Sequence, residues 1–149
     1  MARILLLNPS RWGRGITPIW IASHAAALRR GGHEVALFDA TFYKDWAQNE
    51  NAFNTATQQY MPSPYERLVT FSDTPVRNAL QEKIDAFNPD IVFWSALSSH
   101  IHGEGEYVAI QFGDELMRSM KHHAKKVCGG LQSTADIHAT GERFPAIDY

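Results

Sequence analysis

Small hydroxyl side chains and a pair of glycines follow two of the strands that the sequence predicts. Residues 90–94 are apolar after Asp90 and are followed by Ser95, Leu97 and Ser98. A second predicted strand, residues 124–128, is followed by Gly129, Gly130 and Leu131. Serine hydroxyls hydrogen-bond ring nitrogens or phosphates, and paired glycines let a flat group lie close to the backbone. These residues predict contact with a flat, polar ligand.

A third polar stretch follows the first apolar run, residues 3–7. It offers amide, hydroxyl and guanidinium donors, a stackable indole and a glycine: Asn8, Ser10, Arg11, Trp12 and Gly13. Gly13 and Gly15 lack the third glycine of a dinucleotide fingerprint, and the chain has no P-loop lysine pattern. We therefore expect a ligand site that is not of either nucleotide-binding type.

The elements that must position these residues alternate between strands and helices. Apolar runs predict strands at residues 3–7, 33–39 and 90–94. The short segment at residues 124–128 is a fourth predicted strand, and a fifth begins at residue 147. Helical spacing predicts helices at residues 19–30, from 73–75 to 87, at 107–120 and at 136–143, with Thr17 capping the first. This alternation predicts an α/β fold with a doubly wound, five-stranded parallel sheet, Rossmann-like or flavodoxin-like. In such a sheet the three polar stretches meet at the carboxyl edge.

Composition and charge narrow the class of protein. The 149 residues fit one domain, residues 1–149, with an irregular insertion at about residues 41–72 that we expect to carry short helices. A net charge of −2 gives no basis for binding nucleic acid or an anionic membrane, and no apolar run is long enough to span a bilayer. The single cysteine excludes an internal disulfide and a multi-cysteine cluster in this chain. We expect a cytoplasmic location, no metal site built from protein side chains, and a fragment of a longer polypeptide.

A family resemblance rests on several short motifs in a fixed order. They are Ile4–Pro9, Ala27–Val35, Asp39-Ala40, Asn88–Val92, Ser95-Ala96-Leu97, Gly129-Gly130 and Ile147–Tyr149. In this order the chain resembles the N-terminal cobalamin-binding domain of cobalamin-dependent radical S-adenosylmethionine enzymes. The resemblance covers most of the chain outside the insertion.

The resemblance implies a role for each polar stretch. Ser95 and Leu97 match the family's S-x-L element, and Gly129-Gly130 match its glycine pair, which together hold the dimethylbenzimidazole tail of cobalamin. Members with an axial histidine carry D-x-H-x-x-G after the first strand, whereas this chain has Asn8, Ser10 and Gly13 at those spacings. A hydroxyl is a poor cobalt ligand beside imidazole. We therefore expect base-off cobalamin without a histidine ligand from the protein, with Ser10, Arg11 or Trp12 near its lower face.

The catalytic half of such enzymes has no counterpart in these residues. The family's three-cysteine motif is absent, so the resemblance implies binding here and no catalysis by this chain alone. It also implies a C-terminal radical S-adenosylmethionine domain in cis, with a [4Fe-4S] cluster and S-adenosylmethionine. The expected chemistry is that of a methyltransferase or a related radical enzyme.

Two alternative functions stay open. The N-terminal half of a two-domain glycosyltransferase also begins with a strand, a glycine-bearing loop and a helix ending as Arg30-Gly31-Gly32-His33 does here. The function of such a glycosyltransferase does not require the Ser-x-Leu and Gly-Gly elements. A stand-alone cobalamin carrier is the second alternative. A receiver module fits poorly, because Asn8 and Ser95 stand where it needs acidic residues.

Overall fold

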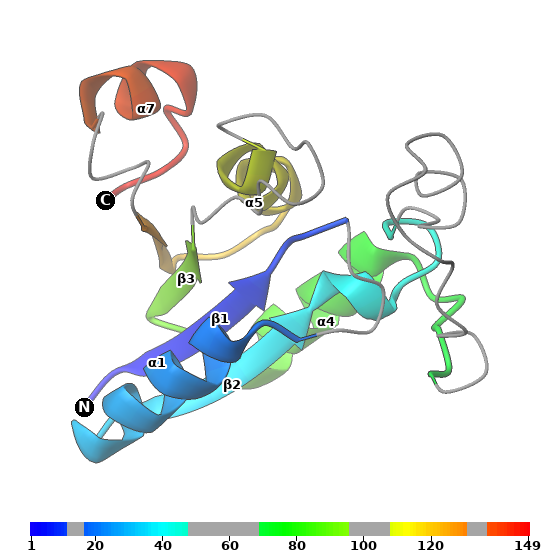
Figure 1. Ribbon diagram of the computed structural model, residues 1–149, viewed down its shortest axis with the longest axis horizontal. Coiled ribbons are helices and arrows are strands. Elements are labelled where there is room, and N and C mark those ends of the chain that lie inside the picture. Colours follow the sequence, from blue (N-terminus) through cyan, green and yellow to red (C-terminus); the bar gives the residue numbers. More distant parts are fainter. Residues whose placement is uncertain (12–16, 48–68, 96–107, 131–136) are drawn as a thin grey trace.

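The computed structural model describes residues 1–11, 17–47, 69–95, 108–130 and 137–149 (Figure 1). Its strands are β1 (Arg3–Asn8), β2 (Glu34–Asp39), β3 (Ile91–Ser95) and β4 (Lys125–Gly129). Its helices are α1 (Ile19–Arg30), the 3₁₀ turn η1 (Ala40–Phe42), α4 (Val76–Phe87), α5 (Val108–Arg118) and α7 (Ile137–Arg143). Strands and helices alternate as the sequence predicts.

The four strands form one parallel sheet in the order β2-β1-β3-β4. β1 lies inside it, and Leu5, Leu6 and Leu7 have no exposed surface. Alternate residues point to opposite faces. Leu5 and Leu7 join a large core with α4 and α5, whereas Leu6 packs with Ile21 of α1. Helices therefore cover both faces, which confirms the α/β class with a parallel sheet and is compatible with a Rossmann-like fold.

The sheet has four strands in the described part of the chain, so the prediction of five strands is wrong. Residues after α7 do approach the free edge of β4. The Cys128 N–H donates to the Tyr149 carbonyl at 2.8 Å, and the Tyr149 N–H donates to the Lys126 carbonyl at 3.2 Å. This is the parallel pairing pattern, but it extends over one residue pair, which is too short to form a strand.

The two described ends of the predicted insertion pack onto the body of the fold. Trp46 is buried among α4 and α5 residues of the core, and Phe71 is buried as well. A single parallel bridge joins Tyr43 to Ser72. Residues 48–68, where we predicted short helices, lie outside the described residues.

Distant contacts set two helix starts that local sequence does not explain. The N-cap of α1 is Pro18, without a side-chain cap, so the prediction that Thr17 caps this helix is wrong. The Thr17 hydroxyl instead donates to Asp39 Oδ2 at 2.7 Å. At α4, both carboxylate oxygens of Asp45 accept from the Val76 N–H at 3.0 and 3.1 Å. A carboxylate at this end also complements the helix dipole.

No helix among the residues that the structure describes is long and apolar enough to cross a membrane.

A close approach of α5 to the sheet generates a stability prediction. A Cβ added at Gly113 of α5 would overlap the fully buried indole of Trp94 on β3, whereas one at Gly141 of α7 would meet nothing within 4 Å. We expect Gly113→Ala to lower the free energy of unfolding by about 1–3 kcal/mol through overpacking. The control Gly141→Ala should leave it unchanged or raise it by up to about 1 kcal/mol. Urea denaturation of both variants measures this, and equal stability of the two would contradict the packing.

Candidate functional site

The carboxyl ends of three neighbouring strands place predicted site residues in one row. Ser95 pairs directly with Gly129 in the register of β3 and β4. Leu6 pairs with Phe93 across β1 and β3, so Asn8 and Ser95 each lie two residues further along. Because side chains alternate along a strand, the row lies on the face that α1 partly covers. The strand order reverses between β1 and β3, which is where open α/β sheets bind ligands.

The β1–β2 half of this row is closed by hydrogen bonds to Asp39. Asn8 is 3% exposed, and its amide donates to Asp39 Oδ1 at 3.0 Å. The same oxygen accepts from the backbone and the hydroxyl of Thr41 at 3.0 and 2.7 Å, and Oδ2 accepts from Thr17. Four donors thus satisfy one carboxylate, and this network gives Asn8 a structural role at the ends of β1 and β2.

The β3–β4 half of the row, which we call the open half, is more exposed than Asn8. Ser95 and Gly129 are half-buried and Gly130 is exposed. A Cβ at Gly129 would lie 2.8 Å from the Phe93 ring, and Gly130 has φ 123°, a conformation that favours glycine. Packing and backbone geometry therefore favour glycine at both positions, and the Phe93 ring lies beside Gly129 on the face that carries Ser95.

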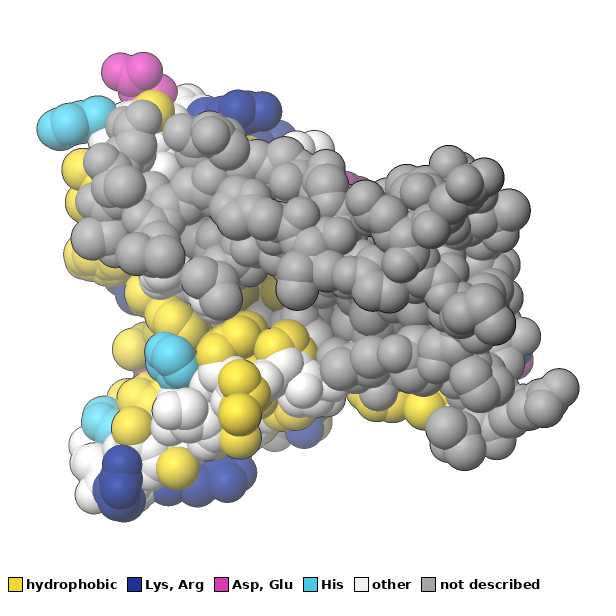
Figure 2. Space-filling view, viewed as in Figure 1, with side chains coloured by type: hydrophobic (Ala, Val, Ile, Leu, Met, Phe, Trp, Pro, Cys, Tyr) yellow, Lys and Arg dark blue, Asp and Glu magenta, His cyan; other side chains and the backbone are white. Residues whose placement is uncertain are grey.

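Aromatic side chains border this open half. Phe93, two residues before Ser95 on the same face, stacks on His24 of α1 with centroids 5.3 Å apart and meets Trp20 edge-on at 6.0 Å. The Trp20 carbonyl accepts from His24 Nδ1 at 2.8 Å. In the neutral ring this places the hydrogen on Nδ1 and leaves Nε2 as an acceptor. Figure 2 shows hydrophobic side chains gathered along α1 on this face.

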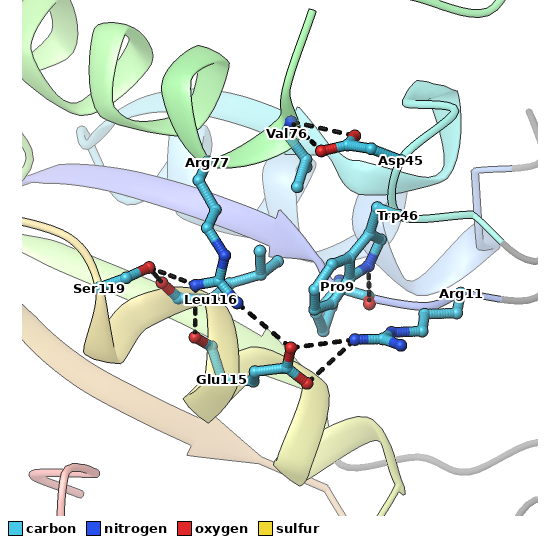
Figure 3. Close-up of polar contacts among 9 residues, drawn as sticks. All are labelled: Pro9, Arg11, Asp45, Trp46, Val76, Arg77, Glu115, Leu116 and Ser119. Atoms are coloured by element: carbon cyan, nitrogen blue, oxygen red, sulfur yellow. Dashed lines mark hydrogen bonds and ion pairs between the residues drawn. The ribbon is translucent and has the colours of Figure 1, made fainter.

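Residues 9–11, the described start of the loop after β1, are tied to α5 and to residues 43–47 (Figure 3). The buried Trp46 Nε1–H donates to the Pro9 carbonyl at 2.9 Å. The Arg11 guanidinium lies 4.0 Å from the Trp46 ring centroid and 4.9 Å from that of Phe112. Its Nη2 donates to both carboxylate oxygens of Glu115 at 3.0 Å. Arg11 therefore points toward α5.

A second arginine shares the same carboxylate. Arg77 of α4 donates to Glu115 Oε1 at 3.2 Å, to the Glu115 carbonyl at 3.1 Å, and to the Ser119 hydroxyl. Glu115 thus joins the loop after β1 to both helices on one face of the sheet (Figure 3). Sequence motifs did not indicate Glu115 or Trp46, because Glu115 lies 104 residues from Arg11 and neither residue belongs to a motif.

The structure describes part of the predicted site. It brings together Asn8, Ser95, Gly129 and Gly130 at one edge, and it turns the Arg11 side chain toward Glu115. Ser10 lies between the two anchored residues Pro9 and Arg11. The remaining predicted site residues, Trp12, Gly13, Leu97, Ser98 and Leu131, lie outside the described residues.

Metal-ligating side chains do not cluster in the described ranges. There, no three His, Cys, Asp or Glu residues are placed to hold a metal ion. In comparisons with known proteins, no family model matches the chain, and no curated protein or solved structure is significantly similar to it. The geometry of the site is therefore the basis for a functional proposal.

The buried thiol of Cys128, the residue before the glycine pair, predicts that the stability of the fold depends on pH. Cys128 is 7% exposed, and burial raises the pKa of its thiol from 9.0 to about 12. Above pH 9 the unfolded thiol loses its proton while the folded one keeps it. The free energy of unfolding should therefore fall as pH rises from 9 toward 12, by up to about 1.4 kcal/mol per pH unit.

Cys128→Ala is the control, because other groups titrate in the same range. Urea denaturation at successive pH values should show a shallower decline for Cys128→Ala than for the wild type. Parallel declines in the two proteins would contradict a buried, neutral thiol.

Proposed function

We propose that this chain binds cobalamin, with the nucleotide tail of the cofactor against the open half of the row formed by Ser95 and Gly129. The observation that carries the proposal is the register at the carboxyl edge. It sets a half-buried hydroxyl beside a glycine on adjacent strands, next to the point where the strand order reverses. The order β2-β1-β3-β4 is also that of the first four strands of a flavodoxin-like sheet, the fold that the family resemblance implies.

The donor set at this edge fits cobalamin held without a protein imidazole. Asn8 occupies the position of the family's aspartate, and its amide is bound to Asp39. Ser10 occupies the position of the family's axial histidine, and a hydroxyl is a weak cobalt ligand. Ser95 supplies a hydroxyl for the heterocycle, and Phe93 an aromatic surface beside it. These residues support base-off binding.

Within a longer polypeptide, this domain would present cobalamin to a C-terminal radical S-adenosylmethionine domain. Bound cobalamin supplies a cobalt centre for methyl transfer or radical chemistry. The residues of this chain would bind the tail and orient the ring; the [4Fe-4S] cluster and S-adenosylmethionine would belong to the other domain. We propose a cytoplasmic methyltransferase or related radical enzyme.

The test of binding is spectroscopic. The purified protein is mixed with hydroxocobalamin and desalted, and the absorption spectrum of the protein fraction is recorded. Retention of stoichiometric cobalamin is the expected result. Loss of all colour would contradict the proposal and favour the alternative that the chain is part of a glycosyltransferase. Electron paramagnetic resonance of cob(II)alamin bound to the protein should show no nitrogen ligand; nitrogen coordination would contradict the base-off assignment.

Ser95→Tyr tests the location of the site. A phenol at residue 95 would stand over Gly129 on the same sheet face and fill the space proposed for the tail. We expect at least about a hundredfold weaker binding of cobalamin, equivalent to roughly 3 kcal/mol, with an unchanged circular dichroism spectrum.

The matched control adds the same phenol elsewhere. Asn78 is exposed on α4, which covers the opposite face of the sheet. Asn78→Tyr should bind cobalamin as the wild type does. Normal binding by Ser95→Tyr would show that the tail does not lie at Ser95.

A further inference from the structure

The Arg11 guanidinium is engaged within the chain through its Nη2 atom and through its planar face. Its Nη2 contacts both oxygens of Glu115, and its guanidinium lies over Trp46 and Phe112 (Figure 3). We infer that Arg11 is a positioning residue: the clamp formed by Arg11, Glu115 and Trp46 fixes residues 9–11 after β1, and Arg11 does not itself contact the cofactor. This inference rests on the proposed function for the identity of the ligand.

Two anchors hold the first and the last of three consecutive residues, Pro9 and Arg11. Trp46 holds the Pro9 carbonyl through its indole N–H, and Glu115 holds the Arg11 side chain. Ser10 lies between them, at the position of the family's axial histidine. The clamp therefore sets where Ser10 stands relative to Asn8 and the rest of the row.

The chemistry of the clamp requires an arginine. A planar guanidinium stacks on aromatic rings while it donates in its own plane, and Arg11 meets both demands at Trp46 and Glu115. A lysine keeps the charge as a compact ammonium without a planar face. Arg77 also binds Glu115, so the carboxylate stays paired when Arg11 is replaced, and loss of the clamp leaves no unpaired anion.

The side chains of the clamp are partly shielded from solvent. The exposed fractions of the Arg11 and Glu115 side chains are 25% and 39%, whereas the ion pair between Arg3 and Glu34 has fractions of 38% and 52%. The Arg3–Glu34 pair lies at the opposite end of β1 from the site. It is a matched control of the same chemistry.

The experiment combines a measurement without ligand and one with cobalamin. Hydrogen exchange of the Trp46 indole N–H, followed by nuclear magnetic resonance in the cofactor-free protein, reports whether the loop is held. The Kd for hydroxocobalamin reports on the site. The variants are Arg11→Gln, Arg11→Lys, Glu115→Gln, the double variant Arg11→Gln/Glu115→Gln, and the control Glu34→Gln.

A clamp predicts coupled effects. Arg11→Gln and Glu115→Gln should each accelerate exchange of the indole N–H and raise the Kd about tenfold. The effects of the double variant should be smaller than the sum of the two single effects, because both replacements remove the Arg11–Glu115 interaction. Arg11→Lys should fall between Arg11→Gln and the wild type, and Glu34→Gln should match the wild type.

Two results would overturn the inference. If Arg11→Gln raises the Kd while Glu115→Gln changes neither Kd nor exchange, Arg11 contacts the cofactor directly. If neither variant accelerates exchange, no clamp holds the loop. Failure of the wild type to retain cobalamin is a different result: it overturns the proposed function and the cofactor part of the inference, while exchange still decides whether the clamp exists.

Discussion

The position of β1 inside the sheet is the constraint on which the rest of this structure depends. Its leucines are buried on both faces, and its backbone pairs with β2 on one side and β3 on the other. The chain therefore leaves β1 in one direction for α1 and β2, and later returns on the other side through α4 to β3. This reversal places helices on opposite faces and separates the strand ends where the candidate site lies.

Most of the fold follows from patterns that are local in the sequence. Apolar runs located β1, β2 and β3, and 3.6-residue spacing located α4 and α5, because burial of one face dominates the packing of these helices. The errors come from contacts between distant residues. Thr17 bonds Asp39 instead of capping α1, and Asp45 supplies the cap of α4 from 31 residues away. The expected fifth strand reduces to the pairing of Tyr149 with β4.

The placement of the candidate-site residues could be predicted from the sequence, whereas their tertiary contacts could not. Residues that follow strands meet at the carboxyl edge of any parallel sheet, so the row of Asn8, Ser95 and Gly129 follows from strand order and register. The surroundings of these residues could not be predicted in this way. The burial of Asn8 against Asp39, the requirement of Phe93 for glycine at residue 129, and the pairing of Arg11 with Glu115 are all tertiary contacts. They divide the edge into a closed half and an open half.

Binding of cobalamin at the open half of this edge is tested most directly by amide chemical shifts. Titration of the ¹⁵N-labelled protein with hydroxocobalamin should shift the backbone amide signals of Ser95, Gly129 and Gly130. Those at the opposite ends of the same strands, at Ile91 and Lys125, should stay in place. Saturable shifts confined to the first group are the predicted result. Absence of shifts, or shifts centred on the opposite edge, would contradict cobalamin binding at Ser95 and Gly129.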